Sequence, residues 1–292
     1  MNSAETPKIS IGLPVFNGQQ YLEEAVSSIV AQTYSNFELI IADNCSTDAS
    51  LAIAKKWQKI DQRIKVIESP TNLGAAPNFN RAFAAARGEF FKWATCDDRI
   101  EPDFLQACID RMESAPDTVL VYSDAMKIDG EGNALRLIYD SKMNLRTDSP
   151  DPLVRFRDLI LCDHSCIAVF GLIRSDALRK TSLIGSYVAS DRVLLARLGL
   201  LGPFSRIDQP LIRHREHSGR STRSIPRLKD RLAWFDTSLP SARVFPNWRL
   251  LKEYASTITT SDLSRWQTTR CFVHLLRWIR YGGWKKLLDD LR

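Results

Sequence analysis

The chain has 292 residues, of which 44% are hydrophobic and 25% charged, and its formal net charge is +6. This is the composition of an ordinary folded protein, with room for one large α/β domain or for a domain with an appended subdomain. No apolar run approaches the roughly 18 residues that cross a bilayer, and no basic stretch followed by an apolar run marks a signal peptide. The six cysteines lack metal-finger spacing and fit a reducing compartment. We therefore expect a cytoplasmic protein, with the inner face of the membrane as a second option.

The positive charge is concentrated in the last third of the chain. Residues 204–292 hold 18 basic and 8 acidic residues, whereas residues 1–203 hold 22 basic and 26 acidic ones. A basic segment favours phosphate groups, an acidic membrane surface or nucleic acid as partner. No nucleic-acid-binding motif accompanies it, so nucleic acid is not expected.

Strands and helices alternate in the first half of the sequence. Apolar, β-branched runs predict strands, and apolar residues spaced by three and four predict helices. The predicted strands cover residues 9–16, 37–42, 64–67 and 90–94, and the helices cover 21–32, a segment from Ser46, and 78–86. This alternation predicts an α/β fold with a mostly parallel sheet covered on both faces.

The second half is less regular. Strands are predicted at residues 119–122 and 167–173, a helix at 190–199, and a linker rich in Arg, Ser and His at 213–227. From Leu228 onward the pattern is helical, with breaks at Pro240, Pro246 and Gly282-Gly283.

An acidic pair, Asp97 and Asp98, follows the predicted strand at 90–94. Open α/β sheets bind their ligands at the carboxyl ends of their strands. Two adjacent carboxylates repel each other and need a cation or strong donors nearby, and hard oxygen ligands suit Mg²⁺ or Mn²⁺. The alternative is a polar turn that caps the helix expected near Glu101.

Two further strand ends carry polar residues. Asp43 ends the second predicted strand, and Asn17 follows the first. The sequence has neither the Gly-x-Gly-x-x-Gly pattern of dinucleotide-binding proteins nor the Gly-Lys-Ser/Thr phosphate loop. These features together predict a nucleotide ligand whose phosphates are held by a metal ion rather than by a glycine-rich loop.

Several short motifs occur together in the order that a known family shows. They are Pro14-Val-Phe-Asn17, Asp43-Asn-Cys-Ser-Thr-Asp48, Asn72-Leu-Gly74 with Asn80, Gly88-Glu-Phe90, Asp97-Asp98, Ala189-Ser-Asp191 and His214-x-x-His217. In this combination the sequence resembles a family 2 inverting glycosyltransferase of the GT-A type, strongly over residues 8–125 and moderately over 165–225. It departs from the family's frequent Asp-x-Asp-Asp pattern, because Thr95 replaces the first acid.

The resemblance implies a GT-A sheet flanked by helices, with a helical C-terminal extension. Residues 1–225 would form the nucleotide-sugar-binding and catalytic domain, with a donor half at 1–125 and an acceptor half at 126–225, and residues 226–292 would form the basic extension. The implied reaction moves a sugar from a UDP- or dTDP-sugar to a hydroxyl group of a glycan or lipid-linked acceptor. It implies a divalent metal, Mn²⁺ or Mg²⁺, as cofactor.

The resemblance also implies roles for individual residues. Asp191 would be the general base, and Asp98 would bind the metal, with His217 as a candidate further ligand. His214 is equally expected to be a functional residue of this kind and to lie in a solvated loop. His164 is expected to be structural. The residues expected at the donor are Pro14, Val15, Asn17, Asp43, Asn72, Asn80 and Asp97.

Two other functions compete with this one. A nucleotidyltransferase also uses an α/β sheet with an acidic metal site, although it would require a glycine-rich, basic loop after the first strand. A glycosyltransferase-like subunit that binds without turnover is the third option.

The C-terminal segment from Arg270 to Tyr281 is amphipathic. Phe272, Leu275, Leu276 and Ile279 share one side of a helix, the arginines lie largely off it, and aromatic residues flank it. This pattern is typical of a helix that lies in the headgroup plane of a membrane. The same stripe is equally expected to pack on the protein's own core or on a partner.

Overall fold

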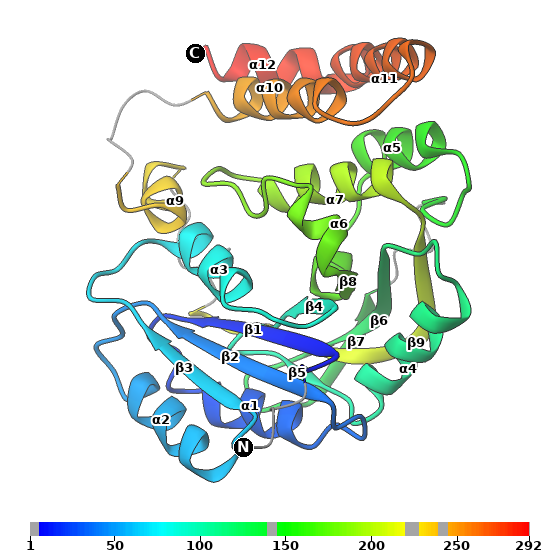
Figure 1. The fold of residues 1–292 in the computed structure, drawn as a ribbon. Coiled ribbons are helices and arrows are strands. Elements are labelled where there is room, and N and C mark those ends of the chain that lie inside the picture. Colours follow the sequence, from blue (N-terminus) through cyan, green and yellow to red (C-terminus); the bar gives the residue numbers. More distant parts are fainter. Residues whose placement is uncertain (1–5, 139–144, 220–227, 239–244, 292) are drawn as a thin grey trace.

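One mixed sheet forms the centre of the molecule in the computed structural model, which describes residues 6–138, 145–219, 228–238 and 245–291 (Figure 1). The strand order is β3-β2-β1-β4-β8-β6-β9-β5, and β7 pairs with β6 off this path. Neighbouring strands among β1 to β4 run parallel, as do β6 and β9, whereas β5, β7 and β8 are antiparallel to their neighbours. The strands are β1 (Ile9–Val15), β2 (Phe37–Asp43), β3 (Ile64–Glu68), β4 (Phe90–Trp93), β5 (Arg99–Ile100), β6 (Leu120–Ile128), β7 (Ala134–Ile138), β8 (Leu172–Arg174) and β9 (Phe204–Arg215).

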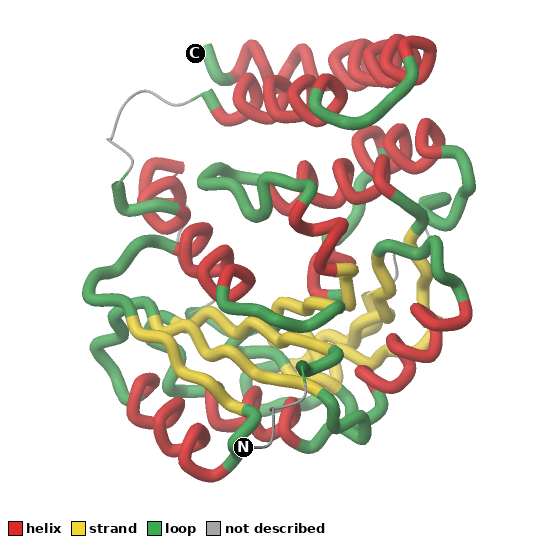
Figure 2. Tube along the Cα trace, in the orientation of Figure 1, coloured by secondary structure: helices red, strands yellow, loops and turns green. Residues whose placement is uncertain are grey.

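Helices cover both faces of this sheet (Figure 2). In the view of Figure 1, α1, α2 and α4 lie below the strands, whereas α3, α6, α7 and α9 lie above them. The helices are α1 (Leu22–Val30), α2 (Ser50–Ile60), α3 (Ala75–Ala84), α4 (Phe104–Ser114), α5 (Pro152–Leu161), α6 (Ser175–Arg179), α7 (Ser190–Leu201), α9 (Leu228–Phe235), α10 (Pro246–Thr259), α11 (Arg265–Trp278) and α12 (Trp284–Asp289).

The parallel half of the sheet confirms the sequence-based prediction. Every residue of β1 and β2 is buried, because helices cover both faces of these strands. The register places Val15, at the end of β1, beside Asp43, at the end of β2. The strand ends that carry the candidate site residues therefore lie at one edge of the sheet.

Two predicted elements differ from the structure. The strand expected at residues 167–173 is a 3₁₀ turn, η2 (Ile167–Phe170), followed by the short strand β8. The chain enters η2 through Cys166, whose φ of 58° lies in the left-handed region. At Gly171 the backbone passes so close to β6 that a Cβ would lie 2.4 Å from the Val121 carbonyl oxygen. A continuous strand over residues 167–173 does not fit the left-handed turn at Cys166 and the close contact of Gly171 with β6.

The linker expected at residues 213–227 begins instead as the end of β9. This strand escaped prediction because polar residues and Pro210 interrupt its apolar pattern. Its pairing with β6 also shifts register around Asp124, which breaks the alternation of buried and exposed positions. Residues 220–227, and the break expected at Pro240, lie outside the described residues.

The buried carboxylate of Glu38 joins three neighbouring segments of the sheet. Its Oε1 atom accepts hydrogen bonds from Ser10 Oγ at 2.6 Å and from the Arg87 backbone N–H at 2.9 Å. Its Oε2 atom accepts from the Arg87 guanidinium at 2.8 Å. Burial alone would raise the pKa of Glu38, but the hydrogen bonds from Ser10 and Arg87 outweigh it and hold the pKa below its ordinary value of 4.5.

The last three helices form a separate layer beyond α5 and α7 (Figure 1). Tyr281 and Gly282 kink the chain between α11 and α12, and Gly282 has a φ of 129° that favours glycine. The kink folds α12 back onto α10, where Asp290 Oδ2 accepts hydrogen bonds from the backbone N–H groups of Asn247 and Trp248. The breaks predicted at Pro246 and Gly282-Gly283 are thus confirmed. None of the helices in the described ranges is long and apolar enough to cross a membrane.

We predict that Glu38→Gln lowers the free energy of unfolding at pH 7 by about 1–3 kcal/mol, because charge-assisted bonds to Arg87 are lost in a buried setting. Since the folded-state pKa of Glu38 is lowered, its stabilisation is present above the unfolded pKa and is lost as the pH falls through the folded-state pKa. Urea unfolding between pH 3 and 7 should show the difference between the two proteins shrinking at acid pH. Glu23→Gln, in an exposed pair with Lys56, is the control, and an equal loss there would contradict the prediction.

Candidate functional site

The loops that follow β1 and β2 are fastened to each other at the edge of the sheet. Asn17 Oδ1 accepts a hydrogen bond from the Thr47 backbone N–H at 2.8 Å, and the Asn17 backbone N–H donates to Ser46 Oγ. Asn17 adopts a φ of 53°, which asparagine tolerates better than most residues. Pro14 and Val15 are buried in β1 directly before this turn. These three predicted donor residues therefore shape the loop that borders Asp43.

Asp43 is 1% exposed and lies at the carboxyl end of β2. Its Oδ2 atom accepts a hydrogen bond from the Ser46 backbone N–H at 3.1 Å. Its Oδ1 atom is buried and has no hydrogen-bond partner among the described residues. Because buried polar atoms are nearly always paired, this oxygen is a candidate acceptor for a ligand N–H group.

Two of the predicted donor residues, Asn72 and Asn80, bind the protein's own chain. Asn72 Oδ1 accepts from Asn44 Nδ2 and from the Gly74 backbone N–H, at 2.8 and 2.9 Å. Asn80 pairs in both directions with the backbone of Ile184, 104 residues later in the sequence. Both side chains therefore position loops. The contacts of Asn80 use both ends of its amide, whereas those of Asn72 use only its Oδ1 atom and leave its Nδ2 group for a ligand.

Gly74 allows the segment after α9 to close over this loop. Gly74 has a φ of 89°, and a Cβ at this position would lie 2.6 Å from the Asp236 Cα atom. Thr237 Oγ1 donates to the Asn72 carbonyl oxygen, and Ser186 Oγ donates to the Asp236 carboxylate. Residues 228–238, which belong to the extension predicted at 226–292, thus contribute directly to the walls of the site.

Asp98 is held between two groups from β9. Its Oδ1 atom accepts a hydrogen bond from the Arg215 backbone N–H at 2.8 Å, and its Oδ2 atom lies 3.0 Å from His214 Nδ1. Burial alone would raise the pKa of Asp98, but the hydrogen bond and charge of His214 and the N–H of Arg215 outweigh it and keep the pKa low. Both oxygens of the residue expected to bind the metal therefore already have protein partners.

Asp97 lies beside the second histidine of the motif. Its Oδ2 atom is 3.1 Å from His217 Nε2, and the His217 ring packs edge-on against Tyr21 with the ring centroids 4.8 Å apart. The side chains of Asp97 and His217 are 23% and 16% exposed, so a ligand can reach the pair. The expected neighbourhood of His217 and the acidic pair is present, with Asp97 rather than Asp98 as its direct contact.

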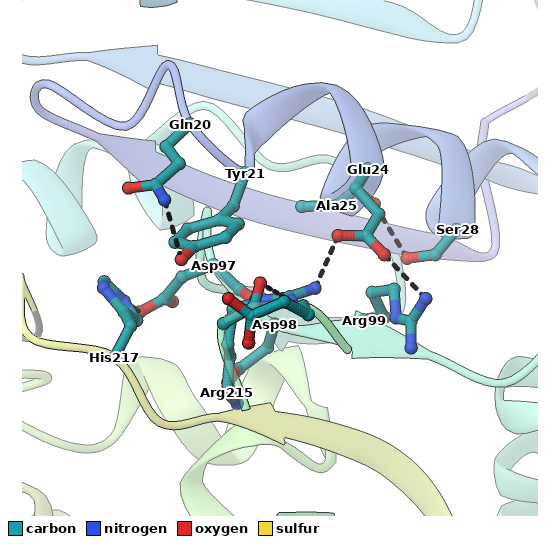
Figure 3. A network of polar contacts seen from close by, with 12 residues as sticks. Gln20, Tyr21, Glu24, Ala25, Ser28, Asp97, Asp98, Arg99, Arg215 and His217 are labelled. Atoms are coloured by element: carbon teal, nitrogen blue, oxygen red, sulfur yellow. Dashed lines mark hydrogen bonds and ion pairs between the residues drawn. The ribbon is translucent and has the colours of Figure 1, made fainter. Parts of the chain in front are cut away.

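Arg215 joins these pieces together, a structural role that was not anticipated from the sequence (Figure 3). Its side chain is 1% exposed. Its Nε atom donates to the Asp97 carbonyl oxygen, its Nη1 atom to the Asp129 and Gly130 carbonyl oxygens, and its Nη2 atom to Glu24. The guanidinium also lies over the Tyr21 ring, 4.5 Å from its centroid. Its place between His214 and His217 was the only signal in the sequence.

Asp191 lines a cavity with a volume of about 800 Å³. The residue stands in the first turn of α7, after Ala189 in the left-handed conformation, and its Oδ1 atom accepts from the Arg192 backbone N–H at 2.8 Å. The wall of this cavity is mostly apolar and aromatic, and includes Phe79, Trp93, Phe170, Val188, Trp234 and Phe235. His214 also lines it, so the cavity adjoins the turn that carries the acidic pair. His164, expected to be structural, contacts the Leu159 carbonyl oxygen.

No cluster of three or more His, Cys, Asp or Glu side chains that could hold a metal occurs in the parts of the chain that the structure describes. Asp97 and His217 offer one oxygen and one nitrogen ligand side by side. This set suits Mn²⁺ or Mg²⁺ when phosphate oxygens and water complete the coordination, as is usual for nucleotide-bound cations.

The comparison with known families agrees with the residues described above. The family described as "Glycosyl transferase family 2" matches residues 10–179, which include β1 to β4 and the acidic pair.

Curated relatives match parts of the chain. An uncharacterized glycosyltransferase of Haemophilus influenzae is 35% identical over 136 residues, which are 47% of this chain and 54% of that protein. The chondroitin synthase of Escherichia coli is 26% identical over 205 residues, which are 70% of this chain and 28% of that protein. The matches thus span less than two thirds of these relatives' lengths.

Solved structures share the fold over nearly the whole chain. Residues 1–349 of Staphylococcus aureus TarS, crystallised with UDP-GlcNAc, superpose with a TM-score of 0.68 at 17% identity, covering 94% of this chain and 73% of that one. The mannosyltransferase PcManGT of Pyrobaculum calidifontis, in complex with GDP-Man and Mn²⁺, gives a TM-score of 0.57 at 14% identity, with coverage of 99% and 74%. At this identity the likeness establishes the fold, which is the GT-A-like sheet expected from the sequence.

We predict that Asp97→Asn and Asp98→Asn have different consequences. Asp97→Asn should leave the melting temperature of the ligand-free protein nearly unchanged and remove the additional stabilisation that Mn²⁺ gives in the presence of UDP. Asp98→Asn should lower the melting temperature without any ligand, because a buried carboxylate that binds His214 and Arg215 loses its charge.

Thermal-shift measurements with UDP, with and without Mn²⁺, test both expectations, and Asp117→Asn at an exposed site is the control. If Asp98→Asn removes the Mn²⁺ response without destabilising the protein, while Asp97→Asn retains the response, Asp98 is the ligand, as the sequence predicts.

Proposed function

Because the chain belongs to glycosyl transferase family 2, we propose that it transfers a sugar from a nucleotide-sugar donor to a hydroxyl group of a glycan or lipid-linked acceptor. The open acceptor at Asp43 carries the donor part of this proposal. The cavity lined by Asp191 and aromatic side chains carries the acceptor part.

The donor base is a pyrimidine, as in UDP or dTDP. Uracil and thymine both present a ring N–H group, and Asp43 Oδ1 is a buried acceptor without a partner in the described residues. Guanine presents a ring N–H group as well, so a direct comparison with GDP is the test of this assignment. Satisfying this oxygen would offset the cost of keeping a carboxylate buried at the end of β2. Arg81, which donates to the Glu68 carbonyl oxygen and to Asn78, keeps the adjacent loop in place.

The diphosphate of the donor lies against Asp97 and His217, which would hold the divalent cation together with phosphate oxygens. The bound cation supplies charge neutralisation for the departing nucleoside diphosphate. Tyr21 packs against the ring of His217, and Arg215 donates a hydrogen bond to the carbonyl oxygen of Asp97. These contacts keep both side chains in position.

Asp191 acts as the general base. Its carboxylate takes the proton from the acceptor hydroxyl while the hydroxyl oxygen forms a bond to the anomeric carbon. The bond between that carbon and the phosphate oxygen breaks, and the nucleoside diphosphate leaves with the electron pair, so that the configuration inverts. Asp191 stands in the first turn of α7, at the end of the helix where the backbone N–H groups have no partner within the helix.

The acceptor lies in the cavity between α3, α7, α9 and the η2 turn. Aromatic faces such as those of Trp93 and Trp234 suit the apolar faces of sugar rings. A glycan acceptor is also consistent with the similarity to chondroitin synthase.

We predict that Asp191→Asn lowers the turnover number by about 10² to 10⁴-fold, because a general base is lost, while donor binding is retained. Asp176→Asn is a matched control, since Asp176 stands in the first turn of α6 and accepts from its neighbour's backbone N–H in the same way, outside the cavity. Release of UDP with a purified acceptor fraction, alongside calorimetry with UDP, separates the two effects. Near-normal turnover by Asp191→Asn would exclude this residue as the base. If the unaltered protein binds the donor but shows no turnover, it is a binding subunit.

A second prediction concerns the choice of base. UDP and dTDP should stabilise the protein more than GDP in the presence of Mn²⁺, and Asp43→Asn should reduce this preference at least several-fold, because one of its two terminal groups becomes a donor. Dissociation constants for the three nucleotides measure the effect. If GDP binds the unaltered protein best, the assignment of Asp43 to a pyrimidine is wrong.

A further inference from the structure

The outer surface of the C-terminal helical layer has an unusual composition. The stripe singled out in the sequence turns inward: Leu275 is 4% exposed, and Phe272 and Ile279 pack against the core. This agrees with the expectation that the stripe belongs to the protein's own interior. Of its four members only Leu276, which is 64% exposed, lies at the surface.

The segment from α11 to the end of the described chain carries most of the exposed large apolar groups of this layer. So many large aromatic and aliphatic side chains are seldom exposed to solvent together on one surface. Their exposed fractions are 64% for Trp266, 64% for Leu276, 73% for Tyr281, 47% for Trp284, 45% for Leu288 and 52% for Leu291. We call these six residues together the outer apolar face.

Basic side chains are interleaved with the outer apolar face. Arg270 and Lys285 lie over the rings of Trp266 and Trp284, with their charged groups 5.8 and 5.6 Å from the ring centroids. Arg277 and Arg280 are exposed on the same helical segment, and within the described part of the chain neither arginine is paired with a carboxylate.

Negative charge is scarce along this segment. Between residues 265 and 291 there are six basic residues, all exposed, and two acidic ones. One of the acidic residues, Asp290, is already engaged in capping the start of α10.

We propose that this surface docks on an anionic lipid bilayer, with α11 and α12 lying along the headgroup plane. The aromatic rings of Trp266, Tyr281 and Trp284 would enter the interface, where indole and phenol groups concentrate. The unpaired arginines and lysines would contact lipid phosphates, to which a basic segment is attracted over about a Debye length.

The charge pattern favours a bilayer over a second copy of this chain. Two copies that meet through the outer apolar face would bring two sets of unpaired basic residues together, which opposes association. A bilayer with acidic lipids offers the opposite charge and an apolar interior at once. The Gly282 kink lets α12 extend this surface beyond the end of α11.

The test is flotation of the full chain with vesicles of phosphatidylcholine containing 30% phosphatidylglycerol, and with vesicles of phosphatidylcholine alone. We expect binding to the anionic vesicles that weakens as salt is raised from 50 to 500 mM, because surface charges are screened. Trp266→Ser with Trp284→Ser, and separately Arg277→Gln with Arg280→Gln, should each reduce the bound fraction by about tenfold or more.

Matched controls lie at the other end of the molecule. Ile60→Ser removes an exposed apolar side chain from α2, and Lys59→Gln with Lys65→Gln removes two exposed charges. These variants should bind vesicles as the unaltered chain does, and circular dichroism should show all variants folded.

Two results would overturn the proposal. One is absence of binding to anionic vesicles at 50 mM salt. The other is sedimentation velocity that shows a dimer abolished by the tryptophan substitutions, which would assign the surface to contacts between copies. Because vesicle binding is measured without donor or acceptor, its outcome is independent of the transferase assignment.

Discussion

A buried positive charge, the guanidinium of Arg215, is the interaction on which the candidate site depends. Removing a guanidinium from water costs several kcal/mol unless its donors are paired. Here the guanidinium binds one carboxylate, Glu24, and three backbone carbonyl oxygens, and a tyrosine ring covers its face. These partners come from α1, from the turn before β5 and from the turn between β6 and β7, so the pairing fixes three separate segments relative to β9.

The different roles of Asp97 and Asp98 follow from this arrangement. The backbone N–H of Arg215 and the ring of His214 hold Asp98, which makes its carboxylate part of the joint between β9 and the loop after β4. Asp97 is left facing His217 at the open side of the turn. A carboxylate that supports the turn thus stands next to one that can meet a ligand, and two neighbouring negative charges are tolerated because each has its own histidine.

The sequence predicted the parallel half of the fold because β1, β2 and β4 are mostly apolar runs with polar residues at or soon after their ends. Asp43 and Asp97 were located by the same rule. The pairing of Asn80 with Ile184 and the reach of Arg215 to Glu24 join residues more than a hundred positions apart, and a single sequence holds no signal for such contacts. In α11 both sides of the helix carry large apolar groups, so periodicity alone could not decide which side is buried, and the packing of α10 and α5 decides it.

The position of β9 has a consequence for how the chain acquires its fold during synthesis. β9 lies between β6 and β5 in the sheet, although about a hundred residues separate β5 from it in the sequence. The first four strands can pair as soon as residue 93 is available, whereas β5 has no partner strand until β9 has been made. Loop closure over such separations is slow, and open strand edges are prone to wrong pairing in the interval. We therefore expect the growing chain to depend on chaperones most while its N-terminal half is made and β9 is not.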